Sequence, residues 1–355
     1  MKNKIIVSRR NFLKKTSVGL GAGLIGTSAL SCSQSFTESK NKLPREVCLA
    51  SVDLKGLWPD TTRESRIRRI LERMEEIAGL QPDIICLPEL FNTIWVSEKN
   101  GRDEVAEDER IPGPVTTIIA EFAKKHECYV TCPVTTKNEG HFYNSSLLID
   151  RKGSIAGVYH KIHPTKTEII PADPENEIGV TPGALNQPVI ETDFGKVGMQ
   201  ICYDANWSDG WDNLKKQRAE IVLFSSAFPG GRILNHHASK NGYYIVSSTG
   251  GDARVVDISG NDLDTSSTFV RYAWARVNLE KVTVPAWPTR DKLPDIFKKY
   301  GDRLGIKVWE YTDVITIESL DRDLKVTDVL KEFDIQTYDQ LLLSHEESQK
   351  KFRHG

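Results

Sequence analysis

Short apolar runs of strand length alternate with amphipathic segments of helix length through most of this 355-residue chain. We expect strands near residues 45–54, 129–134, 144–150, 154–160, 196–202, 220–225, 243–248 and 254–258. Between Arg63 and Leu80 apolar residues recur at helical spacing, while Arg and Glu occupy the other face. Further helices are expected at 114–126, 208–218 and 231–241. Because hairpin strands and strands separated by helices both occur, the pattern predicts a mixed α/β sandwich.

Three chemically reactive side chains occur where a predicted strand gives way to a loop. Cys202 follows the apolar run 197–201, Glu89 follows the run 84–87 and a proline, and Lys161 follows the second strand of a predicted hairpin. A side chain at the carboxyl end of a strand can face the crevice in which open sheets bind ligands. These three residues are therefore the candidate catalytic set.

Each member of this set also has an ordinary interpretation. Cys202 could be a buried and inert thiol, which is the common fate of a free cysteine. Glu89 alone is typical of a solvated turn residue or a helix cap, and Lys161 alone is typical of a surface charge. Only the combination of the three favours catalysis.

The combination suits attack on a carbon–nitrogen bond. A cysteine is a good nucleophile, but it is mostly protonated at neutral pH unless a cation or a base favours the thiolate. A lysine can stabilise the oxyanion of a tetrahedral intermediate together with a backbone N–H such as that of Tyr203, and loss of one such donor costs about 10²–10³ in rate. A glutamate can move the thiol proton to the departing nitrogen and later activate water. This chemistry requires no metal and no organic cofactor.

Three ordered motifs carry a resemblance to a known family. They are LPEL at 87–90, YNSSLLIDRKGSIAGVYHKIHP at 143–164 and GMQICYD at 198–204. Over about residues 45–275 the chain resembles the nitrilase superfamily of carbon–nitrogen hydrolases. The resemblance implies a four-layer αββα sandwich, a homodimer or larger homo-oligomer, and a triad of Glu89 as general base, Lys161 as oxyanion stabiliser and Cys202 as nucleophile.

The resemblance also bears on the substrate. Glu168 matches a second glutamate that positions substrate in the family; the alternative is a loop carboxylate that balances Lys166. Tyr203 is assigned to substrate positioning as well. True nitrilases commonly continue the cysteine with Trp-Glu, whereas this chain continues with Tyr203-Asp204 as in amidase-type branches. We therefore expect a small-molecule amide or carbamoyl substrate, with nitrile hydrolysis, acyl transfer or a non-catalytic binding role as alternatives.

The amino terminus predicts export. SRRNFLKK at 8–15 fits a twin-arginine signal and is followed by a charge-free run too short and too mild for a stable membrane span. A cytosolic basic tail is the alternative. We expect residues 1–31 to be a signal peptide read by the Tat translocase, which would place the protein in the periplasm. Cys32 is positioned for lipidation and hence for membrane anchoring, although ordinary signal-peptidase cleavage nearby fits equally well.

Charge and histidine content point to no nucleic-acid or metal ligand. A net charge of −2 gives no reason to expect nucleic-acid binding. The histidines His160, His163, His236 and His237 do not predict a metal site, because adjacent residues on a helix diverge by about 100°.

We expect a linker at 32–45, a hydrolase domain at 46–280 and a carboxyl-terminal extension at 281–355 that packs on the core or on a dimer partner. In that extension we expect a helix in LPDIFKKYGDRL, one strand in KVWEYTDVITIES and one or two amphipathic helices from Lys325.

Overall fold

The computed structural model describes residues 42–57, 62–99, 101–173 and 177–353. The predicted signal peptide, Cys32 and nearly all of the predicted linker lie outside these residues. The fold below is that of the unit Leu43–Gly355. In the part of the chain that the structure describes, no helix has both the length and the apolar character to cross a membrane.

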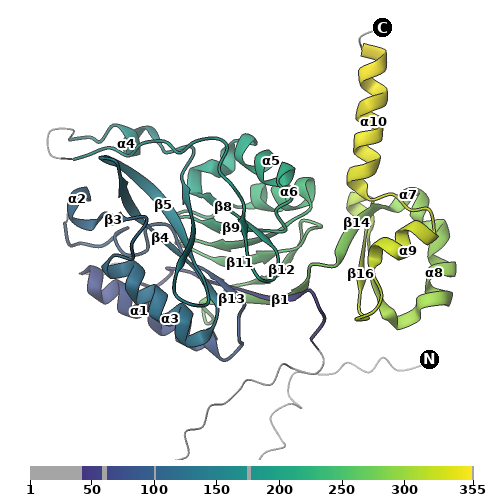
Figure 1. The fold of residues 1–355 in the computed structure, drawn as a ribbon, viewed down its shortest axis with the longest axis horizontal. Coiled ribbons are helices and arrows are strands. Elements are labelled where there is room, and N and C mark those ends of the chain that lie inside the picture. Colours follow the sequence, from purple (N-terminus) through teal and green to yellow (C-terminus); the bar gives the residue numbers. More distant parts are fainter. Residues whose placement is uncertain (1–41, 58–61, 100, 174–176, 354–355) are drawn as a thin grey trace, which may run out of the picture. The chain divides into compact units, whose positions relative to one another are not determined.

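The first sheet has the strand order β13-β1-β2-β4-β5-β6, with β3 beside β4 (Figure 1). Its strands are β1 (Glu46–Val52), β2 (Ile84–Cys86), β3 (Glu107–Asp108), β4 (Tyr129–Asn138), β5 (His141–Ile149), β6 (Ile155–His160) and β13 (Tyr272–Asn278). The strands β1, β2 and β4 run parallel, so their carboxyl ends meet at one edge. Beyond β4, the antiparallel hairpins β4-β5 and β5-β6 add the last two strands of the sheet.

The second sheet has the order β12-β11-β10-β9-β8-β7. Its strands are β7 (Ile190–Glu191), β8 (Lys196–Ile201), β9 (Ile221–Ser225), β10 (Tyr244–Ser248), β11 (Ala253–Val256) and β12 (Asp262–Thr265). The strands β8, β9 and β10 are parallel in register. Apart from Lys196 at the start of β8, every residue of these three strands is buried, which explains their largely apolar sequences.

Alternate residues of the strands build the layers. One face of the first sheet packs on α1 (Arg63–Ala78) and α3 (Pro114–His126). Its other face contributes residues such as Leu49 to a core shared with Met199 and Leu223 of the second sheet. The outer face of the second sheet packs on α5 (Asp209–Lys216) and α6 (Arg232–Asn241). The result is the predicted αββα sandwich.

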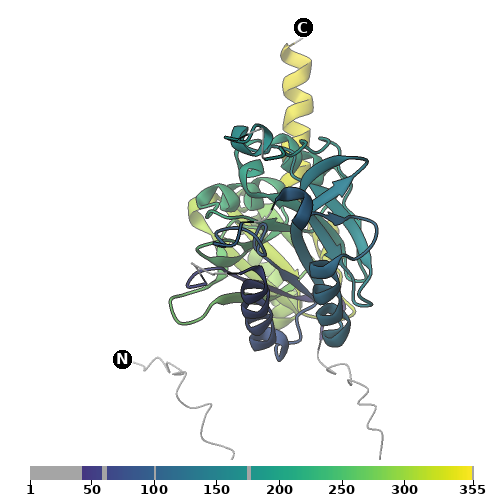
Figure 2. The same cartoon turned by 90° about the vertical axis from the view of Figure 1, so that its left-hand side faces the viewer.

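Local chemistry fixes the two helices on the first sheet. The helix α1 begins at a cap in which the Thr62 hydroxyl accepts the Ser65 N–H at 3.2 Å. The helix α3 begins with Pro114, and the buried Glu107 carboxylate accepts the backbone N–H of Val115 at 2.6 Å. Figure 2 shows α1 and α3 side by side, and Lys125 of α3 forms an ion pair with Glu75 of α1 at 2.7 Å.

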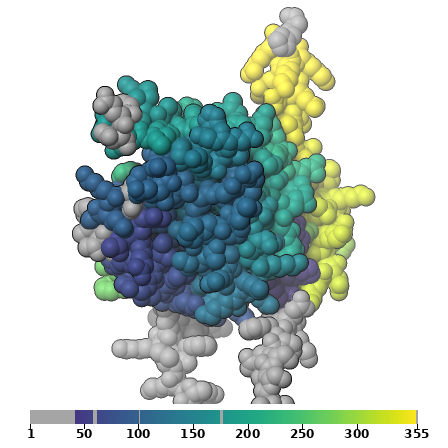
Figure 3. Space-filling view, turned by 60° about the vertical axis from the view of Figure 1, so that its left-hand side comes forward, coloured from purple at the N-terminus to yellow at the C-terminus, as the bar shows by residue number. Residues whose placement is uncertain are grey.

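Residues from Lys281 onward build a small α+β module with its own core. The sheet β14-β16-β15 packs on α8 and α9 through apolar residues that include Ile315, Ile317 and Val329. Its elements are β14 (Lys281–Pro285), α7 (Ala286–Thr289), η3 (Arg290–Lys292), α8 (Leu293–Tyr300), η4 (Gly301–Arg303), β15 (Leu304–Trp309), η5 (Glu310–Thr312), β16 (Val314–Ser319), α9 (Val326–Glu332) and α10 (Tyr338–Arg353). The helix α10, yellow in Figure 3, buries none of its residues.

Two sequence expectations for the chain beyond residue 270 were wrong or incomplete. KVWEYTDVITIES was expected to be one strand, but the chain turns through η5 and pairs β15 with β16 as an antiparallel hairpin. The polar residues Glu310 and Thr312 mark that turn, and Asp313 adopts a left-handed conformation with φ of 52°. The strand β13 was not predicted, although it pairs with β1 along that strand's whole length.

Candidate active site

The ends of three strands bring the candidate residues together. Glu89 lies in the turn after β2, Lys161 directly follows β6, and Cys202 directly follows β8 at the start of the 3₁₀ helix η2 (Cys202–Asn206). Cys202 has a φ of 47°, a left-handed conformation that is uncommon for residues other than glycine. Such conformations cluster at functional sites because the surroundings must hold them in place.

Asp204 holds the segment around Cys202. Its carboxylate accepts the backbone N–H of Ile201 at 2.9 Å and that of His163 at 2.7 Å. The Tyr159 hydroxyl donates to the same carboxylate at 2.8 Å, and both of these residues are buried. These bonds connect the loop after β8 to the segment after β6, so they fix Cys202 relative to Lys161.

The ammonium of Lys161 lies between two carboxylates. Its Nζ donates to Glu89 Oε1 at 2.8 Å and to both oxygens of Glu168 at 2.9 Å. Burial acts to lower the pKa of Lys161, but attraction to Glu89, Cys202 and Glu168 outweighs burial and raises it. The Lys161 side chain is therefore charged at neutral pH.

Neighbouring N–H groups donate further hydrogen bonds to the carboxylates of Glu89 and Glu168. Asn144 Nδ2 donates to Glu89 Oε1 at 2.8 Å and to Glu168 Oε1 at 2.9 Å. The backbone N–H of Ala227 donates to Glu89 Oε2 at 2.9 Å, and that of Thr165 donates to Glu168 Oε2 at 2.7 Å. Glu168 lies at the third position of α4 (Lys166–Ile169), where its carboxylate also completes the cap at Thr165. Three donors thus hold the Glu89 carboxylate in one orientation.

The Cys202 thiol is in contact with this cluster. Burial and the negative charge of Glu89 raise the pKa of Cys202 to about 11, while Lys161 and a hydrogen bond with Ser226 act to lower it. At neutral pH the free site therefore contains a protonated thiol beside a carboxylate that can accept its proton.

Comparison with known proteins identifies the fold family. The sequence model of the carbon-nitrogen hydrolase family matches residues 48–269, which is more than half of the chain. The chain belongs to the carbon-nitrogen hydrolase family. The match ends before the carboxyl-terminal module that begins at Lys281.

Characterised relatives of this carbon-nitrogen hydrolase family member are distant. The deaminated glutathione amidase of Dictyostelium discoideum is 25% identical over 223 residues, which cover 59% of this chain and 74% of that protein. The mouse deaminated glutathione amidase is 28% identical, covering 47% and 53% respectively. The beta-ureidopropionase of Arabidopsis thaliana is 27% identical, covering 55% and 50%. The matched segments thus span about half the length of the mouse and Arabidopsis relatives.

Solved structures support the same fold. A carbon-nitrogen hydrolase from Helicobacter pylori superposes with a TM-score of 0.52 at 18% identity, covering 72% of this chain and 93% of that one. A variant of the amidase from Nesterenkonia sp. superposes with a TM-score of 0.52 at 14% identity, covering 72% and 96%. In that variant the acetamide moiety of fluoroacetamide is attached covalently to the active-site cysteine. At these identities the likeness establishes the fold.

The Tyr203 side chain lies at the surface. The residue is 43% exposed and its ring packs edge-on against Trp207, with ring centroids 5.1 Å apart. Among the residues that the structure describes, the Tyr203 side chain forms no hydrogen bond with Glu89, Lys161 or Glu168. Its role in substrate positioning stays a prediction.

The histidines have structural partners. His237 stacks on Trp211 at 4.2 Å, and its Nε2 lies 3.0 Å from the Ala205 carbonyl oxygen. His163 stacks on Trp207 at 4.3 Å and contacts Asp204. Across the described ranges, no three His, Cys, Asp or Glu side chains form a group that could hold a metal ion.

Several residues of the site were not singled out in the sequence. Asn144 and Asp204 lie inside the quoted motifs, but nothing in the local pattern distinguishes a carboxylate-binding amide from an ordinary strand polar residue. Ser226 and the backbone N–H of Ala227 follow β9, which is the strand next to β8. Their position at the end of a buried parallel strand is the one signal that could have indicated them.

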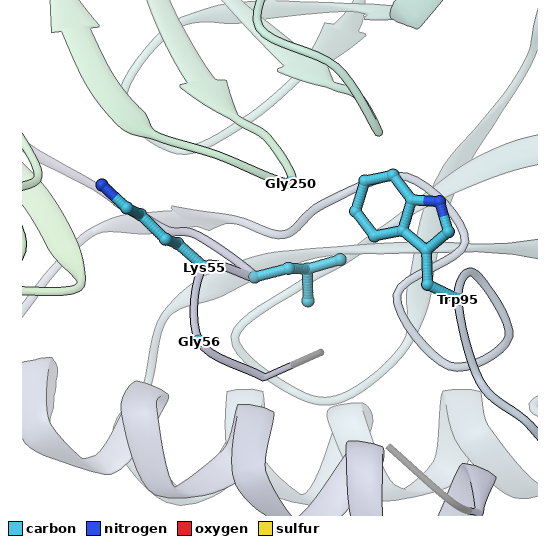
Figure 4. Close-up of a pocket in the computed structure, with 5 residues that line it drawn as sticks. Lys55, Gly56, Trp95 and Gly250 are labelled. Carbon is cyan, nitrogen blue, oxygen red and sulfur yellow. The ribbon is translucent and has the colours of Figure 1, made fainter. Parts of the chain in front are cut away.

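Two cavities adjoin the segments that form the cluster. One, of about 400 Å³, is lined by Leu54, Lys55, Gly56, Trp95 and Gly250. Figure 4 shows the Trp95 ring on one side of it and the Lys55 side chain pointing away from that ring. The Gly250 N–H donates to the carbonyl oxygen of Ala227, the residue that holds Glu89. The other, of about 490 Å³, extends from Leu90 to Arg102 and Thr135.

Proposed function

We propose that this protein is an amidase-type hydrolase that cleaves a non-peptide amide or carbamoyl bond of a small molecule through a cysteine thioester. One observation carries the proposal: the Glu89 carboxylate is hydrogen bonded to the Lys161 ammonium in a buried cluster, and its negative charge acts on the neighbouring Cys202 thiol. The names of the related amidases and of the beta-ureidopropionase support the same reaction class.

The first half of the proposed reaction forms the acyl-enzyme. Cys202 Sγ attacks the carbonyl carbon as Glu89 takes the thiol proton, and this produces a tetrahedral oxyanion. Lys161 and the backbone N–H of Tyr203 would stabilise that oxyanion. When the C–N bond breaks, protonated Glu89 gives its proton to the departing nitrogen, so that ammonia or an amine leaves and a thioester remains.

The second half releases the acid. Glu89 takes a proton from water as the water oxygen attacks the thioester carbon, and the new oxyanion is held by the same donors. The C–S bond then breaks, and Glu89 returns the proton to sulfur, which restores the thiol. A thiol pKa of about 11 suits this cycle, because the sulfur is protonated at rest and base catalysis by Glu89 is required for every attack.

Ammonia release tests the proposal. Purified protein would be assayed on small amides, carbamoyl compounds and nitriles, with Cys202→Ala as the matched control. We expect turnover of amides or carbamoyl compounds by the unaltered protein alone, together with a thioester that hydroxylamine traps. Equal activity of the Cys202→Ala protein would refute the mechanism, and trapping without hydrolysis would instead indicate acyl transfer.

We further propose export through the Tat pathway, with the protein in the periplasm and Cys32 as the candidate lipid attachment site. The support is the SRRNFLKK motif and the charge-free run after it. Cell fractionation with and without a functional Tat translocase, followed by intact mass of the mature protein, measures both points. Sedimentation measures the expected homodimer or larger assembly.

A further inference from the structure

The end of an edge strand carries Lys161. The strand β6 ends at His160 and is the last strand of the first sheet, and among the strands that the structure describes only β5 pairs with it. On the β5 side, the Lys161 N–H donates to the Asn144 carbonyl oxygen at 2.9 Å. A lysine side chain has a flexible four-carbon stem, so its ammonium is directed precisely only where the backbone is fixed. The contacts on the open side of β6 therefore affect the position of Lys161.

The Gln187 side chain takes the place of a neighbouring strand on that open side. An edge strand leaves backbone N–H and C=O groups unpaired. Here Gln187 Oε1 accepts the backbone N–H of His160 at 2.7 Å, and Gln187 Nε2 donates to the His160 carbonyl oxygen at 2.5 Å. One residue further on, the Gly183 N–H donates to the Lys161 carbonyl oxygen at 2.8 Å. Residues 183–187 therefore close the edge of β6 where it meets Lys161.

The fit between this segment and the strand end is tight. Gln187 is buried. A methyl group added at Gly183 would lie 2.4 Å from the His160 carbonyl oxygen and 2.8 Å from Gln187 Nε2, which is closer than packed atoms approach. The His160 side chain is held as well, because its Nδ1 lies 2.8 Å from the Ser145 hydroxyl oxygen and its ring stacks on that of Tyr143. Backbone and side-chain contacts thus both fix the residue that precedes Lys161.

Gln187 is also anchored to the helix that follows the nucleophile. The Gln187 carbonyl oxygen accepts Asn213 Nδ2 of α5 at 3.1 Å, and it accepts Gln217 Nε2, at the end of α5, at 2.9 Å. The helix α5 comes directly after the segment that contains η2, and Cys202 is the first residue of η2. A continuous series of hydrogen bonds therefore joins α5 to Gln187, and Gln187 to the residue before Lys161.

We propose that Gln187 is a positioning residue that sets the place of Lys161 relative to Cys202. It acts through the backbone of His160, and it takes no part in proton transfer or in substrate binding. This inference rests on the proposed hydrolase function, in which the Lys161 ammonium must meet an oxyanion that forms beside Cys202. A displacement of about 1 Å in such a site can lower the rate about a hundredfold.

The test compares Gln187→Leu with Asn278→Leu. Leucine removes the donor and the acceptor of the amide and keeps an apolar side chain in their place. Asn278 is the matched control because its buried amide likewise donates to a backbone carbonyl oxygen, that of Ser319 at 2.6 Å, and accepts a backbone N–H, that of Glu280 at 2.9 Å. It lies opposite Glu46 at the start of β1, away from the strand ends that carry the cluster. The measurements are kcat and KM for ammonia release, the thermal midpoint, and the rate of Cys202 alkylation by iodoacetamide at pH about 9.

Both substitutions should lower the thermal midpoint, because each leaves buried backbone groups without a partner. Only Gln187→Leu should also impair the reaction, with kcat lower by about ten- to hundredfold and KM changed by less than about twofold. Lys161 acts to lower the pKa of the Cys202 thiol, so a displaced ammonium leaves that pKa higher. Alkylation should therefore slow several-fold in Gln187→Leu and keep its rate in Asn278→Leu.

Four results would overturn the inference: unchanged kcat in a folded Gln187→Leu protein, a loss confined to KM, an equal loss of kcat in the control, or unchanged alkylation. If Gln187→Leu does not fold, Gly183→Ala replaces it, because the added methyl group must displace the same strand end. Unchanged kcat and alkylation in that variant would equally refute the inference. Alkylation requires no turnover, so a protein that hydrolyses no amide would defeat the proposed function while the alkylation rates still test the position of Lys161.

Discussion

Lys161 Nζ lies 2.8 Å from Glu89 Oε1 although the two side chains are only 2% and 4% exposed. Removing two charges from water is costly, and the cost is recovered only where the geometry is good and further hydrogen bonds satisfy both groups. Here Glu168, Asn144 and the backbone N–H of Ala227 complete the network. The charged atoms of the pair are thus all hydrogen bonded within one buried network, and loss of a donor or of a charge should have large effects.

Replacement of Lys161 tests that network most directly. Lys161→Ala leaves two carboxylates without their cation, one of them buried, so we expect loss of turnover and a destabilisation of about 3–5 kcal/mol. Denaturant unfolding measures the free energy, and Lys152→Ala, at an exposed lysine in the β5-β6 turn, is the control. A Lys161→Ala protein as stable as the control would show that the cluster contributes little to folding.

Glu89→Gln should separate thiol reactivity from catalysis. Burial and the Glu89 charge raise the Cys202 pKa to about 11, so alkylation by iodoacetamide in the unaltered protein should increase with pH up to that region. Removal of the Glu89 charge leaves Lys161 as the main charged neighbour and lowers the thiol pKa. The thiolate fraction below the pKa rises about tenfold for each unit, while nucleophilicity falls less steeply.

We therefore expect Glu89→Gln to be alkylated at least several-fold faster near pH 8 while its turnover is lost. The measurement is the rate of mass increase by one adduct, with Cys202→Ala as the blank. Slower alkylation in Glu89→Gln would mean that Glu89 activates the thiol in the resting site, contrary to the pKa argument.

Asn144→Leu removes an N–H group that both carboxylates share. Leaving a buried polar group short of a partner costs about 1–3 kcal/mol, so we expect a stability loss in that range. Because Glu89 loses one of its orienting donors, kcat should also fall. The discriminating measurement is the pair of kcat and KM, since loss of orientation of the base affects kcat more than KM. A change confined to KM would place Asn144 in substrate binding instead.

The carboxyl-terminal module should respond as a packed unit. Ile317 of β16 is completely buried, whereas Val308 of β15 is 45% exposed. Ile317→Ala should destabilise by about 2–5 kcal/mol through lost contacts and a cavity. Val308→Ala should change stability by less than about 1 kcal/mol. Amide hydrogen exchange would locate the change, and equal effects of the two substitutions would contradict the separate core described here.

How much of the fold was predictable differs between its two halves. The longer central strands and the covering helices of the sandwich were expected within a few residues, because buried parallel strands and amphipathic helices carry strong periodic signals, whereas the short strands β3, β7 and β12 were not expected. The strand β13 carries charged and aromatic residues and lacks such a signal, and its pairing with β1 across more than 200 positions is a tertiary event. The hairpin of β15 and β16 depends on a polar turn that was read as part of one strand.

The sequence by itself determined which residues could react, because a cysteine, a lysine and a glutamate each follow a strand and recur in an ordered set of motifs. Tertiary structure alone decided their electrostatics. Glu168 joins Lys161, Asn144 bridges two carboxylates, and the Tyr203 side chain is exposed. The reason is physical: a pKa depends on burial and on charges within a few ångströms, and residues far apart in sequence supply both.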